Sequence, residues 1–184
     1  MPITIEVIVE RLQAVDFKKE TWKPAAIPKD EAERTKVISS LDILDQVGTE
    51  PFFDGIVEFV HGSFNAPMAG ISIIEGARDY KLSHLGMLKE VARDISWCSH
   101  VVTTGRTIIA EDTQKHEIFK EYPLVKDGTI RFYVGVPLSV DDVIVGVLCV
   151  LDYVPRTFSN QDRLELEGFA QTMMRASRQG KDMN

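Results

Sequence analysis

Two apolar segments separated by only four residues constrain the fold of this chain more than any other feature. Both lie within residues 128–155, GTIRFYVGVPLSVDDVIVGVLCVLDYVP, and residues 139–142 separate them. A connection this short joins antiparallel neighbours, because a parallel pair needs a crossover of about a dozen residues or more. The sequence therefore predicts a β-hairpin.

The two strands of this hairpin have different side-chain patterns. In the first strand, alternation predicts one core-facing side, made by Phe132, Val134, Val136 and Leu138, and one semi-polar side. The second strand, residues 143–151, is apolar on both faces, which is typical of a strand near the middle of a sheet that is covered on both sides. Short elements over such a sheet leave room for a cavity.

Helical patterns lie before and after the strands. Apolar residues at helical spacing predict helices over residues 31–46, bounded by Asp30 and Gly48, and over residues 49–62. Ser159 and Asp162 resemble a capping box and predict the start of a last helix, with Arg175 and Arg178 near its end. We also expect a short helix around residues 87–93 and a helical turn at residues 116–121 that ends at Pro123.

Further strands and the amino-terminal segment complete the interpretation. Alternation predicts strands at residues 67–74, 78–83 and 107–111. Residues 3–15 fit either a strand or a helix, and that choice stays open. Residues 18–30, with two prolines among charges, indicate an extended connector. We therefore divide the chain into an amino-terminal arm and connector (1–30), one domain (31–178) and a tail (179–184).

Several motifs, taken in order, resemble the GAF domain family of small-molecule sensor modules, in a bacterial-type subgroup. They are SWCSH at residues 96–100, IAEDT at 109–113, YPLV at 122–125, IRFYVGVPL at 130–138 and GVLCVLD at 146–152. The resemblance covers about residues 33–178. It implies an α+β, PAS/GAF-like fold, with an antiparallel sheet of five or six strands. Terminal helices would pack on one face, and loops and short helices would cover a pocket on the other.

Charge and cysteine content limit the partners and the compartment. The formal net charge of −7 opposes binding to phosphate backbones and anionic lipids, and the basic residues are scattered, so we expect no nucleic-acid and no membrane partner. The two cysteines have no framework spacing, which indicates a reducing compartment. With no apolar run of membrane-spanning length and no signal-peptide pattern, we expect a cytoplasmic protein.

The cluster Trp97, Cys98 and His100 is the densest group of reactive side chains. A thiol beside an imidazole can be activated as a nucleophile or a redox switch, because a nearby imidazolium lowers the pKa of the thiol. The alternative, which we favour, is a small buried Cys98 and a His100 that bonds a backbone carbonyl. The four histidines form no metal-binding pattern, so we expect no metal site.

Arg131 and Tyr133 share a strand face and are candidates for holding an anionic or planar ligand. Asp112 and Asp152 end apolar strands, where loops converge on the mouth of a cavity. Alternatively, Arg131 forms a structural salt bridge with Asp112 or Asp152, because a buried guanidinium must find a partner. Both aspartates can also cap the turns that follow them.

Specific activities of GAF proteins can be compared with these residues. The free-methionine sulfoxide reductases of this family use a set of cysteines; Cys98 stands near one of these positions, but residues 114–124 contain no partner. The segment that carries the bilin-attaching cysteine in other members, here residues 116–121, has no Cys, and the Asn-Lys pattern of cyclic-nucleotide binders is missing at Asn65. No complete catalytic constellation is present, so we expect no enzyme and assign no catalytic residue and no cofactor.

These observations predict a regulatory signal-transduction module. It would bind a small polar or anionic ligand near Trp97, Cys98, His100, Asp112, Arg131, Tyr133 and Asp152. Ligand binding would be relayed through the terminal helices, in a homodimer or to a separate signalling protein. The alternatives are a thiol-based redox sensor or enzyme that uses Cys98, and a dimerisation module that binds no ligand.

Overall fold

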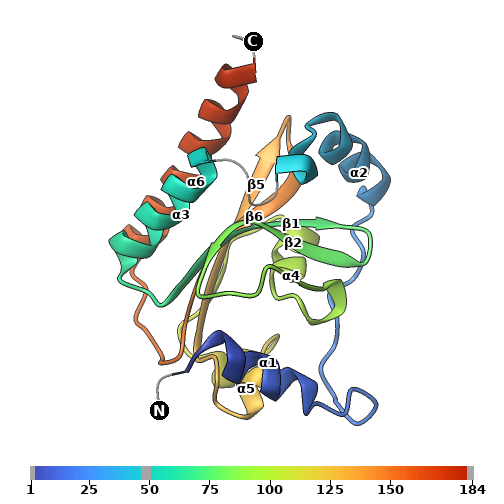
Figure 1. The fold of residues 1–184 in the computed structure, drawn as a ribbon, viewed down its shortest axis with the longest axis vertical. Coiled ribbons are helices and arrows are strands. Elements are labelled where there is room, and N and C mark those ends of the chain that lie inside the picture. Colours follow the sequence, from blue (N-terminus) through green and yellow to red (C-terminus); the bar gives the residue numbers. More distant parts are fainter. Residues whose placement is uncertain (1–2, 47–50, 182–184) are drawn as a thin grey trace.

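The structure, a computed structural model, describes residues 3–46 and 51–181. Within these ranges, six strands form one antiparallel sheet in the order β3-β2-β1-β6-β5-β4. The strands are β1 (Met68–Glu75), β2 (Arg78–Leu85), β3 (Glu90–Ala92), β4 (Ile108–Ala110), β5 (Phe132–Val140) and β6 (Val143–Asp152). Helices cover both faces of this sheet (Figure 1). The α+β fold predicted from the sequence is confirmed.

The predicted hairpin is formed by β5 and β6. Their pairing runs from Phe132 opposite Asp152 to Val140 opposite Val143, so the turn is shorter than the four residues expected. Asp141 and Asp142 form it, with φ angles of 49° and 66°. Two consecutive left-handed residues suit a two-residue hairpin turn, and aspartate tolerates this region better than most residues.

Strand β6 lies inside the sheet, as its continuous apolar sequence predicts. It pairs with β1 on one side and with β5 on the other. Val147 and Leu148, which point to opposite faces, are both completely buried. Each face of the sheet therefore has its own hydrophobic core.

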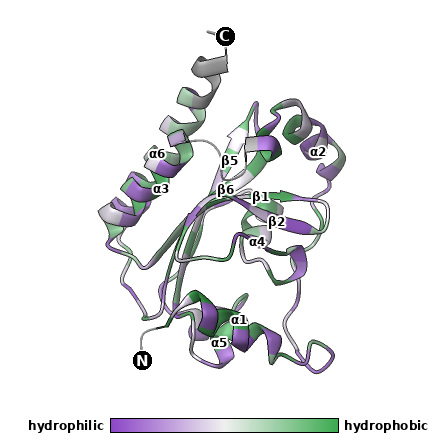
Figure 2. Cartoon of the chain, viewed as in Figure 1, coloured by the Kyte–Doolittle hydropathy of each residue, from purple (hydrophilic) through white to green (hydrophobic). Residues whose placement is uncertain are grey.

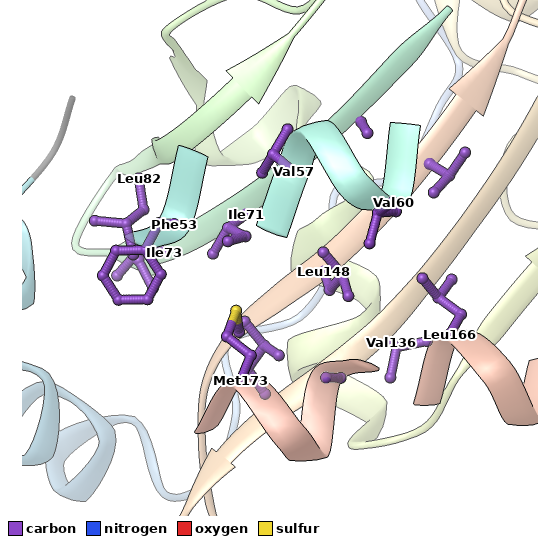
Figure 3. Close-up of a cluster of buried hydrophobic side chains, with 14 of the residues drawn as sticks. Phe53, Val57, Val60, Ile71, Ile73, Leu82, Val136, Leu148, Leu166 and Met173 are labelled. Carbon is purple, nitrogen blue, oxygen red and sulfur yellow. The ribbon is translucent and has the colours of Figure 1, made fainter. Parts of the chain in front are cut away.

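The first core lies between the sheet and the helices α2 (Glu31–Ser40), α3 (Pro51–Phe64) and α6 (Asn160–Lys181). Figure 3 shows Val57 and Val60 of α3 and Leu166 of α6 converging on Leu148 of β6 and Val136 of β5. The core-facing side predicted for the first hairpin strand contributes to this cluster. In Figure 2, α3 and α6 carry both hydrophilic and hydrophobic residues, as expected of helices that bury one side.

The second core covers the opposite face. Its helices are α1 (Ile5–Gln13), α4 (Cys98–Thr104) and α5 (Pro123–Lys126). The segment 3–15, for which strand and helix were both open, contains the helix α1. α1 packs against α5 (Figure 1), so part of the amino-terminal arm lies on the domain. This is the face for which short helices and a pocket were expected.

One local prediction is wrong, and another is correct except for its end. Residues 87–93 do not form a helix: Glu90–Ala92 form β3, which pairs with the start of β2, and Arg93–Ile95 form a short 3-10 helix, η2. The helical turn predicted at 116–121 is present, since the backbone N–H of Lys120 donates to the His116 carbonyl at 3.0 Å. Pro123 does not end the helical segment, however, but begins α5, where its missing N–H costs nothing. The helix α4 was not predicted.

The boundaries of the long helices also differ from the predictions. The first one ends at Ser40, is interrupted by Asp42 with a φ of 50°, and resumes as the 3-10 helix η1 (Ile43–Gln46). α3 continues through Gly62 to Phe64. The predicted boundaries at Gly48 and Thr49 lie outside the described residues. A further 3-10 helix, η3, spans Thr113–Lys115.

The capping box of α6 is present as predicted. The backbone N–H of Ser159 donates to Asp162 Oδ2 at 2.8 Å, and the backbone N–H of Asp162 donates to Ser159 Oγ at 3.1 Å. These bonds satisfy amide groups that have no partner within the helix. α6 then extends to Lys181, beyond the expected end of the domain at residue 178.

Candidate functional site

A cavity of about 120 Å³ lies within the second core. Apolar side chains form most of its wall, including Ile8 and Leu12 of α1, Met87 before β3, and Leu151 of β6. Trp97, Tyr122 and Tyr133 add aromatic surface. An apolar cavity with a few polar groups is the usual form of a small-molecule site.

The charged part of this wall is the pair Asp79 and Lys81. These residues alternate along β2 and so point to the same face of the sheet. Their side chains are 1% and 5% exposed, and Lys81 Nζ lies 2.7 Å from Asp79 Oδ2. Burial, the largest single effect, lowers the pKa of Lys81, but Asp79, with smaller contributions from Cys98 and Cys149, raises it above its ordinary value. Lys81 therefore keeps its charge at neutral pH.

The Asp79 carboxylate is only partly satisfied. Ser96 Oγ donates to Asp79 Oδ2 at 2.5 Å, so this oxygen accepts from both Ser96 and Lys81. Asp79 Oδ1 is buried and has no hydrogen-bond partner among the described residues. A buried carboxylate oxygen without a donor is costly. Asp79 is therefore a group that a ligand can complete.

The two cysteines meet at another part of this core. Cys98 begins α4 and lines the cavity, and its Sγ accepts from Ser72 Oγ at 3.3 Å and from Tyr133 Oη at 3.4 Å. The Cys149 thiol donates to the Gly70 carbonyl oxygen at 3.5 Å, and its interaction with Cys98 lowers the pKa of Cys98. The same interaction, together with burial, raises the pKa of Cys149 well above its ordinary value. Cys98 is therefore the more readily ionised thiol.

His100 bonds a side chain and not the backbone carbonyl that the sequence suggested. Its Nε2 lies 2.7 Å from Tyr122 Oη, and that hydroxyl donates to the Lys23 carbonyl at 3.3 Å. Burial, with a smaller effect from His116, lowers the pKa of His100 to about 4. A neutral imidazole cannot promote ionisation of Cys98 by its charge, so the thiol depends on its other neighbours.

Arg131 forms the structural salt bridge that was one of the two alternatives. Its Nη2 donates to Asp112 Oδ1 at 3.0 Å and to Oδ2 at 3.1 Å. Asp112 Oδ1 also caps the backbone N–H of Gln114 at 3.2 Å. Asp152 is paired with Arg156, whose Nε lies 2.5 Å from Asp152 Oδ2. These ion pairs tie the ends of strands to the loops that follow.

The structure brings together some of the sequence-predicted site residues and adds others. Trp97, Cys98 and Tyr133 line the cavity, whereas His100, Asp112, Arg131 and Asp152 do not belong to its described wall. Sequence reasoning missed Asp79, Lys81 and the contact of Cys149 with Cys98. Two opposite charges at alternate positions of a strand were the available signal, but such a pattern usually marks a solvated face.

Comparison with known proteins agrees with this architecture. The GAF domain family model matches residues 48–176. The chain belongs to the GAF domain family. No curated protein matches it. Within the described residues, no helix has the length and apolar character needed to span a bilayer, and no group of His, Cys, Asp and Glu side chains could hold a metal ion.

Solved GAF structures share the fold at low identity. The GAF domain of an Acinetobacter phosphoenolpyruvate-protein phosphotransferase is 17% identical, with a TM-score of 0.61 over 83% of this chain and 96% of that one. A Neisseria meningitidis free methionine-R-sulfoxide reductase is 18% identical, with a TM-score of 0.57 over 88% and 99%. A domain assigned to a Sinorhizobium meliloti two-component sensor histidine kinase is 16% identical, with a TM-score of 0.57 over 72% and 92%.

Proposed function

We propose that this GAF protein is a regulatory module that senses a small polar molecule bound in the cavity of the second core. The observation that carries the proposal is the buried pair Asp79–Lys81 in an otherwise apolar wall, with Asp79 Oδ1 lacking a donor. A hydrophobic pair would suit packing alone at least as well, because burying ions is costly. Retaining two charges at a cavity supports a binding role.

The relay would run through the helices that touch the cavity. Ile8 and Leu12 place α1 in its wall, and Trp97 and Cys98 place the start of α4 there. A ligand that contacts these residues can favour one arrangement of the helices over another, in proportion to its difference in affinity for the two. The output would pass to a second copy of the chain through its terminal helices, or to a separate signalling protein.

A thermal-denaturation screen against a metabolite library of amino acids, purines and cyclic nucleotides tests the proposal. A ligand at one hundred times its dissociation constant stabilises the folded state by about 2.7 kcal/mol, which gives a clear shift in Tm. We expect the shift to survive in Arg131→Ala, because Arg131 is paired outside the cavity wall, and to decrease in a Trp97→Ala variant. A library that shifts neither the wild type nor Arg131→Ala would contradict ligand sensing.

A second candidate function, thiol-based redox sensing, is favoured by the Cys98–Cys149 contact. A hydroperoxide would oxidise the Cys98 thiolate to a sulfenic acid and leave as an alcohol, or as water from hydrogen peroxide. The Cys149 thiol would then attack the sulfenic sulfur, form a disulfide and release water. Mass spectrometry of peroxide-treated protein should show the loss of two hydrogens, and Cys149→Ser should stop at the sulfenic acid. Unmodified thiols after treatment would exclude this function.

A further inference from the structure

The cavity wall carries two opposite charges and no net charge. Among the described residues that form it, Asp79 and Lys81 are the charged ones, and they neutralise each other. A ligand with a net charge would bring an uncompensated ion into an apolar, buried space, which is unfavourable. The wall therefore favours a neutral ligand over a carboxylate or an amine.

The hydrogen-bonding capacity of the pair defines the polar edge of such a ligand. Asp79 Oδ1 needs a donor, because Ser96 and Lys81 both donate to Oδ2. Lys81 carries three N–H donors, and its ion pair with Asp79 uses one of them. A group with an N–H beside a carbonyl oxygen would satisfy both side chains at once.

The size and lining of the cavity define the rest of the ligand. Its volume of about 120 Å³ is somewhat below the ~150 Å³ of an engineered apolar cavity in another protein that holds benzene. Trp97, Tyr122 and Tyr133 offer ring surfaces against which a flat molecule can pack. A single six-membered ring is the upper limit that this volume sets, so any polar substituent must be small.

We propose that the cavity selects neutral single-ring molecules that present an amide-like edge, such as a lactam or a primary carboxamide. The N–H donates to Asp79 Oδ1, the carbonyl oxygen accepts from Lys81 Nζ, and the ring packs among the aromatic side chains. This inference rests on the proposed function in one respect: that a ligand occupies this cavity.

Isothermal titration calorimetry with a matched panel tests the selection. Benzamide and 2-pyridone carry the amide-like edge, benzoate and benzylamine carry a net charge, and toluene carries no polar group. We expect benzamide and 2-pyridone to bind at least about tenfold more tightly than the other three, because one satisfied buried polar partner is worth about 1–3 kcal/mol. Tighter binding of benzoate, or equal binding of toluene and benzamide, would overturn the inference.

A double variant tests whether the ion pair is responsible for the selectivity. Asp79→Asn alone leaves a buried Lys81 with a weakened partner and can impair folding. The double variant Asp79→Leu/Lys81→Met removes both charges at similar volume, which folded proteins often tolerate. In this variant we expect benzamide to lose its advantage while toluene binds at least as well as before. Retained preference for benzamide would show that other groups select the ligand.

The ligand panel and the metabolite screen together distinguish failure of the amide-like ligand class from failure of the proposed ligand sensing. A metabolite that shifts the wild type, combined with a panel that binds without the expected order or not at all, refutes the amide-like class and leaves ligand sensing standing. If no compound binds in the panel and none shifts Tm in the screen, the amide-like ligand class and ligand sensing are both refuted.

Discussion

Gly146 occupies a position on β6 where a side chain has no room. A Cβ there would lie 2.4 Å from the carbonyl oxygen of Ser72 on β1, next to the register shift between Ile71 and Ser72. We expect Gly146→Ala to lower the free energy of unfolding by about 1–3 kcal/mol or more, because backbone atoms must move to accommodate the methyl group. Urea denaturation measures this change.

Gly168 provides the matched control for this substitution. It lies within α6, and a Cβ at this position would meet nothing within 4 Å. Gly168→Ala should raise the free energy of unfolding by about 0.5–1 kcal/mol, because alanine loses less conformational freedom in a helix. If both substitutions changed stability equally, the close approach at Gly146 would not be the cause.

The pKa of His100 predicts how stability depends on pH. Its folded-state pKa of about 4 lies below its ordinary value of 6.5, so between these values the unfolded chain binds a proton that the folded chain does not. Stability therefore falls as the pH is lowered through this window. His100→Gln should show a smaller loss of stability than the wild type between about pH 7 and pH 5 in urea denaturation. Burial also lowers the pKa of His116, so the variant should still lose some stability over this pH range. Equal losses of stability in the variant and the wild type would contradict the assignment to His100.

At the scale of elements, α1 is attached to the domain mainly by one side. Ile8 is 5% exposed and contributes to the cavity wall, whereas Ile5 of the same helix is 38% exposed. Ile8→Ala should destabilise the protein by about 2–4 kcal/mol through lost burial and an enlarged cavity. Ile5→Ala should cost clearly less. Equal effects in thermal denaturation would mean that α1 does not pack through Ile8.

The elements that the sequence predicted well are those whose signal is local. The β5–β6 hairpin follows from alternation, a short connection and two aspartates that accept left-handed geometry. By contrast, β3 spans three residues and exists because Glu90–Ala92 pair with β2, a partner that a local pattern does not contain. The seven residues of α4 include two threonines and a valine pair, which are weak helix formers.

The candidate site was harder to predict than the fold, for a related reason. Asp79 and Lys81 look like the solvated face of a strand, but Ser96 bonds Asp79 and both residues are buried in the cavity wall. Cys98 and Cys149 are far apart in the sequence, and only the packing of α4 on β6 brings them together. Arg131 pairs with the carboxylate of Asp112, one of the two aspartates that the sequence offered as its salt-bridge partner.

At the scale of the whole molecule, α3 and α6 lie side by side on one face (Figure 1). Both helices also expose large apolar side chains. Phe59 of α3 is 59% exposed, and Leu164 of α6 is 49% exposed. If a second copy covers these helices, Phe59→Glu should weaken the dimer about tenfold or more, because it buries an unpaired charge. Sedimentation at several concentrations measures the effect.

Val154 supplies the control for this experiment. It is also apolar and 57% exposed, but it follows β6 and lies outside both helices. Val154→Glu should leave the oligomeric state unchanged. A wild-type protein that stays monomeric at all concentrations, or equal effects of both substitutions, would contradict a dimer through α3 and α6.

The position of α1 affects the timing of any response. Ile8 and Leu12 form part of the cavity wall, and Arg11 secures the helix through an ion pair with Asp127 at 3.5 Å. If a ligand enters and leaves on the α1 side of the cavity, α1 has to lift, which breaks apolar packing as well as the ion pair. The lifetime of the complex would then be set by the opening of a helix and not by diffusion. Such a protein would report the recent history of its ligand's concentration and not its instantaneous value.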